Sequence, residues 1–258
     1  MFEKIKCFIL DMDGTIYLGN ELFSFTKDFL KKVKETGREY YFFTNNSSKS
    51  QQDYIEKLER FGIRIKRQQM MTSTHVISRY LKQHYEGKSV YVLGTPSLIQ
   101  EFQYFGINVT EEDPDIVVLG FDTTLTYEKL SKACHYIRNG CIYFGINPDW
   151  NCPMEGGAFI PDCGSIAKLI EASTGRFPEF FGKPSKHTLD YIIQETGYEP
   201  DEIAIVGDRL YTDIAVADQS DVMSILVLSG ESTREDVKTS DVKPNVILED
   251  LSEITKML

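Results

Sequence analysis

Apolar runs of strand length alternate with amphipathic helical segments along almost the whole chain. Eight runs have the apolar character of buried strands: IKCFILD, EYYFFTN, SVYVLG, DIVVLGF, CIYFGIN, EIAIVGD, SILVLS and NVIL. Between them, apolar residues share one helical face, as in residues 50–61 before Gly62 and residues 185–196 before Gly197. This alternation predicts an α/β fold built on a doubly wound, Rossmann-like parallel sheet that helices cover on both faces.

The middle of the chain forms a strand–helix series of its own. It runs from SVYVLG through CIYFGIN to the helical segment GSIAKLIEASTG. Eight strands are many for one open sheet, and 258 residues suffice for two small domains. We therefore expect a core domain of residues 1–86 and 178–258, into which a smaller α/β domain of residues 87–177 is inserted.

The formal net charge of −11 bears on the partners of the protein. A nucleic-acid polymer or an anionic membrane surface needs clustered Lys and Arg, so neither is an expected partner. No apolar run approaches the length of a membrane span, and acids interrupt the first apolar run too early for a signal peptide. Five cysteines without a CxxC pair and four scattered histidines argue against a zinc site or a disulfide framework. A cytoplasmic protein is therefore expected.

Two carboxylates end the first apolar run. Asp11 and Asp13 follow the apolar residues FIL, and Gly14 and Thr15 come next. Side chains two residues apart on a strand point to the same side, and ligands bind at the carboxyl edge of doubly wound sheets. Two acids placed there repel each other and resist the loss of water unless a cation neutralises them. A turn without any chemistry is the alternative, since Asp is common in turns.

Other strand-like runs end in groups that suit the same edge. FFTNN ends with Thr44 and Asn45, a hydroxyl and a backbone amide suited to phosphate oxygens. EFFGKPSK holds Lys183 between a glycine and a proline, and IAIVGDRLYTD carries Asp208 and Asp213. Each group alone has an ordinary interpretation, such as a helix cap for Thr44 and Asn45 or a solvated side chain for Lys183. Taken together with the paired acids, they make a functional site the better interpretation.

Four motifs in this order resemble those of the haloacid-dehalogenase-like phosphatase superfamily: DMDGT, TNN, GKP and GDRLYTD. Three features resemble the NagD-like branch of this superfamily: the segment LDMDGTIYLGN around the first motif, the sequence GKPS at the third, and the insertion between the second and third motifs. That branch carries a type-2 α/β cap, so the resemblance implies such a cap over residues 87–177. All four motifs in sequence are far more specific than a single DxDGT.

The resemblance implies a role for each motif residue. Asp11 would be the nucleophile that forms an aspartyl-phosphate, and Asp13 the acid and base that protonates the leaving oxygen and then activates water. Mg²⁺ would be held by the carboxylates of Asp11 and Asp208 and by the backbone carbonyl of Asp13, an oxygen set that suits a hard cation.

The remaining motif residues would serve the phosphoryl group. Thr44 and the backbone amide of Asn45 would hold it, and Lys183 would pair with the nucleophile and a phosphate oxygen. Asp213 would either contact the residues that bind the metal or itself provide a further carboxylate ligand.

The loop GINPDWNCPMEGG carries the most distinctive polar residues of the insertion. Asn147 and Asp149 flank Pro148, a combination that is strong turn chemistry in its own right. The resemblance implies more, because the equivalent cap loop of NagD-like enzymes faces the active site and selects the leaving group. FIPDCGSI has Asp162 where that branch is expected to carry glycine.

The expected function is that of an Mg²⁺-dependent phosphatase acting on small phosphomonoesters such as nucleoside monophosphates or sugar phosphates. A phosphoryl-transferring mutase of the same superfamily is one alternative, although such mutases usually carry a helical cap. A non-catalytic phospho-receiver module is another, although receivers are about half this length and lack an inserted domain. Assembly into a homo-oligomer through the cap is left open by the sequence.

Overall fold

The computed structural model describes residues 2–154 and 157–258, and the chain divides into two compact units. The first unit consists of Met1–Thr44, Ile55–Met71 and Lys183–Leu258, and the second of Asn45–Tyr54 and Thr72–Gly182. The second unit contains all of the expected insertion, residues 87–177, together with flanking residues. The exact boundaries of that insertion stay a prediction.

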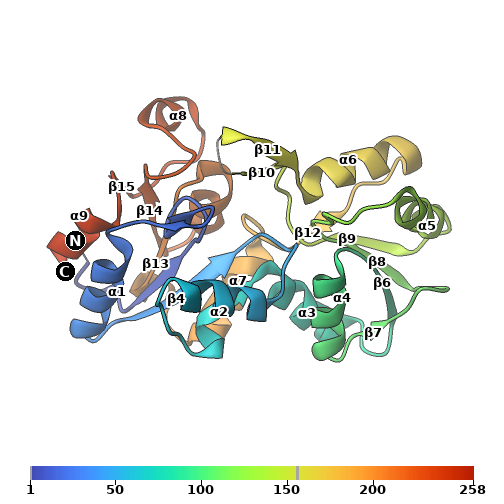
Figure 1. Cartoon of the computed structure of the whole chain (residues 1–258), viewed down its shortest axis with the longest axis horizontal. Coiled ribbons are helices and arrows are strands. Elements are labelled where there is room, and N and C mark those ends of the chain that lie inside the picture. The colour runs from blue at the N-terminus through green and yellow to red at the C-terminus, as the bar shows by residue number, and fades with distance from the viewer. Residues whose placement is uncertain (1, 155–156) are drawn as a thin grey trace. The chain divides into compact units, whose positions relative to one another are not determined.

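The first unit is built on a six-stranded sheet, seen with its helices in Figure 1. The strand order is β15 (Val246–Leu248), β14 (Met223–Val227), β13 (Ile203–Gly207), β1 (Cys7–Leu10), β4 (Glu39–Thr44) and β5 (Met70–Thr72). β1 runs parallel to both β13 and β4, and β14 runs parallel to β13 and β15. β1, β13 and β14 are largely buried, as parallel strands covered on both faces should be.

Helices and short turns complete the first unit. α1 packs against α9 (Figure 1). The elements are the helices α1 (Thr26–Glu35), α7 (Lys186–Thr196), α8 (Arg234–Thr239) and α9 (Leu251–Met257), the short helical turns Arg67–Gln69, Pro200–Glu202, Leu210–Ile214 and Ala215–Ala217, and the hairpin of β2 (Tyr17–Leu18) and β3 (Glu21–Leu22). α2 (Gln51–Arg60) begins in the second unit and ends in the first.

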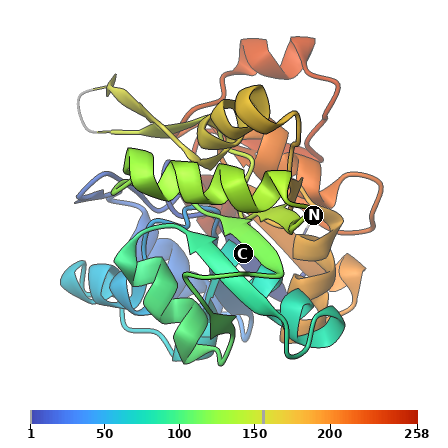
Figure 2. The same ribbon diagram turned by 90° about the vertical axis from the view of Figure 1, so that its right-hand side faces the viewer.

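The second unit holds a parallel five-stranded sheet. Its order is β12 (Glu179–Phe180), β9 (Ile142–Gly145), β8 (Ile116–Leu119), β6 (Ser89–Leu93) and β7 (Asn108–Val109). Its helices are α3 (Ser73–His84), α4 (Pro96–Tyr104), α5 (Tyr127–Arg138) and α6 (Cys163–Thr174), and β10 (Asn151–Pro153) pairs with β11 (Phe159–Pro161). Figure 2 shows α5 and α6 side by side over this sheet, where they bury a common apolar core.

The α/β class and the parallel sheets expected from the sequence are confirmed. Each of the eight apolar runs contains a strand, and helices follow most of them. The short strands β5, β7 and β12 were not anticipated. Among the described residues, no helix combines the length and the apolar composition needed to cross a membrane.

Candidate active site

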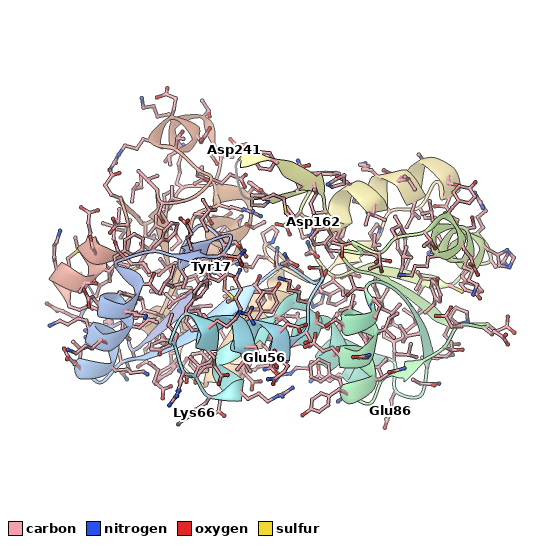
Figure 3. The ribbon with its side chains drawn as sticks, in the orientation of Figure 1. Tyr17, Glu56, Lys66, Glu86, Asp162 and Asp241 are labelled. Atoms are coloured by element: carbon pink, nitrogen blue, oxygen red, sulfur yellow. The ribbon has the colours of Figure 1, made fainter. Side chains whose placement is uncertain are left out.

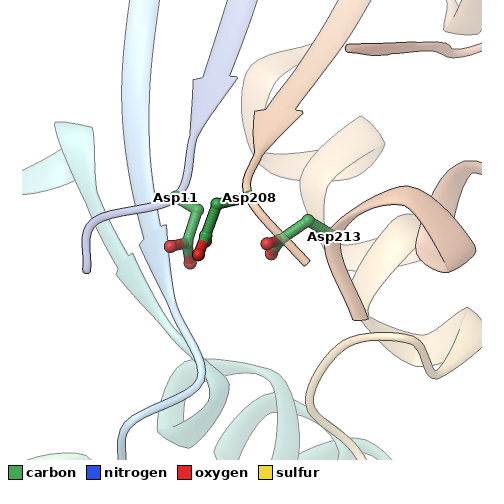
Figure 4. Close-up of side chains that lie close together, drawn as sticks. All are labelled: Asp11, Asp208 and Asp213. Atoms are coloured by element: carbon green, nitrogen blue, oxygen red, sulfur yellow. The ribbon is translucent and has the colours of Figure 1, made fainter. Parts of the chain in front are cut away.

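Three carboxylates meet in the first unit at the carboxyl edge of its sheet. Asp11 follows β1 and Asp208 follows β13, and these strands are neighbours with Leu10 opposite Val206. Asp213 lies in the helical turn Leu210–Ile214 that comes just after. One oxygen from each of the three carboxylates lies within 4.8 Å of the others, and Figure 4 shows the three side chains gathered together.

Lys183 ties two of these acids together. Its Nζ donates to Asp11 Oδ1 at 2.6 Å and to Asp213 Oδ1 at 2.5 Å, and it reaches the Phe43 carbonyl oxygen at 3.4 Å. The lysine is only 2% exposed. It therefore provides one buried positive charge among three carboxylates.

The electrostatics of this cluster favour an added cation. Burial raises the pKa of Asp11 well above its usual range, and the negative charge of Asp213 adds to that rise while Lys183 opposes it. Burial also raises the pKa of Asp208 to about 7, with Asp213 as the next cause. Burial alone would lower the pKa of Lys183, but Asp11 and Asp213 raise it above its usual value. The lysine is thus charged, while burial and the neighbouring negative charge disfavour ionisation of Asp11 and Asp208.

Asp208 provides a direct test of whether a metal fits. Its Oδ2 accepts a hydrogen bond from the Glu231 amide at 2.7 Å, whereas its Oδ1 is buried and has no hydrogen-bond partner among the described residues. A Cβ at Gly14 or Gly230 would collide with this carboxylate, so both positions require glycine. A buried carboxylate oxygen left open beside two further acids is a donor set that suits Mg²⁺.

Asp13 lies where the chain turns after β1. The Tyr17 hydroxyl donates to Asp13 Oδ2 at 3.2 Å, and the Gly14 amide donates to the Tyr17 carbonyl at 2.8 Å. Gly14 has a φ of +87°, which the turn requires and which side chains disfavour. Tyr17 is fully buried, and Figure 3 labels its place in the first unit. No pattern in the sequence indicated that this tyrosine would contact Asp13.

Thr44 and Asn45 mark a point where the chain passes between the units. Thr44 is the buried last residue of β4 in the first unit, and Asn45 is the first residue of the second. Within the second unit, Asn45 Nδ2 donates to Asp149 Oδ2 at 2.9 Å. Asn147 and Asp149 are 0% and 2% exposed. The structure thus brings Asn45, Asn147 and Asp149 together, and their expected roles stay predictions.

Comparisons with known proteins bear on the whole chain. A sequence model described as haloacid dehalogenase-like hydrolase matches residues 8–108, and a second, HAD-hydrolase-like model matches residues 180–254. The acid sugar phosphatase of Staphylococcus aureus (strain MRSA252) is 34% identical over 252 residues, which are 97% of each chain. The chain belongs to the haloacid dehalogenase-like hydrolases. The expectation drawn from the four motifs is therefore confirmed.

Solved structures indicate to which branch of this family the chain belongs. The 4-nitrophenylphosphatase of Thermotoga maritima is 43% identical and superposes with a TM-score of 0.95 over 99% of this chain and 98% of that one. NagD from E. coli K-12 is 30% identical with a TM-score of 0.87 over 96% and 98%. The chain is a NagD-like member of the family and an enzyme. Nothing in these relatives supports the non-catalytic receiver alternative.

Proposed function

We propose that this NagD-like hydrolase is an Mg²⁺-dependent phosphatase that cleaves small phosphomonoesters, with sugar phosphates as the favoured class. The observation that carries the proposal is the buried cluster of Asp11, Asp208 and Asp213 around Lys183, with Asp208 Oδ1 left open. The names of the relatives, an acid sugar phosphatase and a 4-nitrophenylphosphatase, suggest the substrate class.

The chemistry assigned to the side chains is a double displacement. An Asp11 oxygen attacks phosphorus, the bond to the ester oxygen breaks, and Asp13 gives its proton to that oxygen as the alcohol leaves. Water then attacks the phosphorus of the aspartyl-phosphate and gives a proton to Asp13, and the Asp11 carboxylate is released with inorganic phosphate. Atoms and charges balance over the two steps, and Asp13 ends in its starting state.

The metal site is assigned to the Asp11 and Asp208 carboxylates and the Asp13 carbonyl oxygen. Bound there, Mg²⁺ would supply positive charge that lowers the repulsion between the nucleophile and a phosphate dianion. Asp213 has a different role in this assignment, because its Oδ1 accepts from Lys183 and its Oδ2 accepts from the Arg209 amide at 3.0 Å. It orients the lysine, which remains beside Asp11.

Steady release of inorganic phosphate tests the proposed function. The purified protein, supplied with Mg²⁺, should release phosphate from p-nitrophenyl phosphate and from a panel of sugar phosphates and nucleoside monophosphates. Ranking the panel by kcat/KM identifies the preferred class. Transfer of the phosphoryl group between sugar positions without net phosphate release would instead support the mutase alternative. A cytoplasmic location and assembly through the second unit stay predictions.

Replacing Lys183 should weaken both activity and folding. Lys183→Met leaves Asp11 and Asp213 buried without their cation, which costs about 3–5 kcal/mol of folding stability. We expect kcat to fall by ~10²-fold as well, because a charge beside the nucleophile is lost. The destabilisation should shrink toward pH 4, because burial raises the pKa of Asp11 and protonation removes its unpaired charge. Thermal unfolding between pH 4 and 8 measures it.

Lys186→Met is the matched control for this substitution. Lys186 lies three positions along the chain, and its side chain is 81% exposed and paired with Asp190. Exposed pairs of this kind contribute about 0.3–0.5 kcal/mol, so the control should unfold nearly as the unchanged protein does. Equal losses for the two variants at pH 7.5 would contradict the role given to the buried lysine.

A further inference from the structure

Asn45 is held from two sides within the second unit. Its side-chain amide donates to Asp149 Oδ2 at 2.9 Å, and its backbone carbonyl accepts from Ser73 Oγ at 2.9 Å. Both hydrogen bonds are buried. Fixing the side chain and the following peptide of one residue leaves its own backbone N–H little freedom to reorient. Asn45 follows Thr44 directly, where the chain enters this unit.

The acceptor of this side-chain bond is itself fixed by Asn147. Asn147 Nδ2 donates to Asp149 Oδ2 at 2.9 Å and to Asp162 Oδ1 at 3.0 Å, and its Oδ1 accepts from Ser47 Oγ at 2.7 Å. An asparagine side chain has two N–H donors and one carbonyl, so all of these groups have partners here. Such a fully bonded buried group has one favoured orientation.

The network is anchored to regular structure. Asp162 caps the N-terminus of α6, where its side chain accepts from the Cys163 amide, and Figure 3 shows it at that end of the helix. The Gly164 amide donates to the Asp149 carbonyl at 2.8 Å, and a Cβ at Gly164 would collide with the Pro148 carbonyl. The first turn of α6 therefore holds the NPD segment closely and leaves no room for a side chain.

The side chains of Asn147 and Asp149 are buried, whereas residues that select a leaving group must be accessible to it. The side chains of Asn147 and Asp149 offer almost no accessible area, and their hydrogen bonds are made within the protein. A specificity residue must present a donor or acceptor to the substrate. A positioning role for Asn147 and Asp149 fits the observed contacts more directly.

We propose that Asp149 and Asn147, together with Ser73, are positioning residues that fix Asn45 so that its backbone amide meets the transferring phosphoryl group in a set orientation. This inference rests on the proposed phosphatase function and on the phosphoryl-binding role that the family resemblance implies for the Asn45 amide. A donor that is already oriented costs no reorganisation during the reaction. Because every substrate shares the phosphoryl group, these residues affect all substrates alike.

The experiment compares Asp149→Ala on two unlike substrates. We expect kcat/KM to fall by about 10- to 100-fold, and by the same factor, for p-nitrophenyl phosphate and for the best sugar phosphate, since misplacement of a binding group by about 1 Å can cost ~10²-fold. The inhibition constant of orthovanadate, which mimics the pentacoordinate phosphoryl group, should rise in parallel. Asp149→Asn should recover most of the loss, because its amide oxygen can still accept from Asn45.

Two further variants keep the test independent of folding. Ser73→Ala removes the other bond to Asn45 and should give a smaller loss of the same pattern, about 3-fold on both substrates. Asp122→Ala is the matched control, because Asp122 is also a buried carboxylate of the second unit but bonds Thr124 and Lys129 instead. The control should lose thermal stability while keeping its kcat/KM and vanadate inhibition when assayed well below its melting temperature.

The outcomes separate this inference from the function on which it rests. An unchanged protein that releases no phosphate from any ester would overturn the proposed function. With an active unchanged protein, loss of sugar-phosphate hydrolysis by Asp149→Ala, with p-nitrophenyl phosphate and vanadate unaffected, would overturn the positioning role and favour leaving-group selection. No loss with any ligand would also overturn it.

Discussion

Asp11→Asn should abolish turnover. We expect kcat to fall by at least ~10⁴-fold, which is the usual magnitude when a catalytic nucleophile is lost. An amide is a poor nucleophile toward phosphorus, and the exchange also removes one charge from the proposed metal site. The fold should survive, because the amide oxygen of the variant can still accept from Lys183. Phosphate release under saturating substrate, with circular dichroism as a check on folding, measures the effect.

Loss of activity alone would not separate a nucleophile from a metal ligand, so the covalent intermediate must be trapped. Asp13→Ala lacks the group assigned to activate water and should accumulate a phosphate adduct when given p-nitrophenyl phosphate, whose leaving group needs no proton. Rapid quenching and peptide mass spectrometry should place the adduct on Asp11. An adduct on a serine or histidine would refute the mechanism. Asp190→Asn, an exchange at the exposed Lys186 pair, is the control for loss of one surface charge.

The sequence was a good guide to the candidate site where each functional group sits at the end of a strand. The apolar runs before Asp11 and Asp208 are β1 and β13, and because these parallel strands are neighbours in register, their last residues reach the same edge of the sheet. Lys183 lies 172 positions from Asp11, a contact that no local pattern encodes. The end of EFFGKPSK suits the same edge of the sheet, but the pairing of Lys183 with Asp11 was implied only by the resemblance to a family.

Burial of polar residues was harder to foresee. The NPD segment predicts a turn, and turns are usually exposed, yet Asn147 and Asp149 are buried. Their partners come from far along the chain, 104 positions away for Asn45 and 100 for Ser47. Turn chemistry is local and carries no information about such partners. Asp162 caps α6, and its place before a helical segment, where Asp is a common N-cap, is a local signal that could have indicated this contact.

The short strands escaped prediction for a related reason. β5, β7 and β12 contain three or two residues each, too few for an alternating pattern. They form strands because each pairs with the backbone of a longer neighbouring strand, β12 with β9 and β7 with β6. Within EFFGKPSK, only the first two residues, Glu179 and Phe180, form the strand β12.

Removal of Mg²⁺ should lower kcat by at least ~10³-fold, because the lost charge stabilisation at the phosphoryl group amounts to several kcal/mol. A chelator should have this effect, and added Mg²⁺ should reverse it. Ca²⁺ should occupy the same carboxylates yet support little turnover, since its looser and higher coordination does not hold the nucleophile in line. Full activity in metal-free buffer would refute the metal assignment.

The same metal should stabilise the fold in a pH-dependent way. Without a cation, the pKa of Asp208 is about 7 against an ordinary value of 3.8, so the folded state holds this proton more tightly than the unfolded state. Asp208 therefore contributes stability that is fully present below about pH 4 and is lost as the pH rises through 7. Mg²⁺ binds the ionised carboxylate, so the metal competes with the proton.

The rise in melting temperature caused by Mg²⁺ should accordingly be small at pH 5 and grow toward pH 8. At 100 times its Kd the metal adds about 2.7 kcal/mol, or roughly 5–10 °C for a chain of this size. Ca²⁺ should give a similar rise without activity, which would separate binding from catalysis. Asp208→Asn should lose both the rise and its pH dependence, while Asp190→Asn should keep them. A rise equally large at pH 5 and pH 8 would mean that the metal binds elsewhere, because only a site whose carboxylates must first give up protons couples the two.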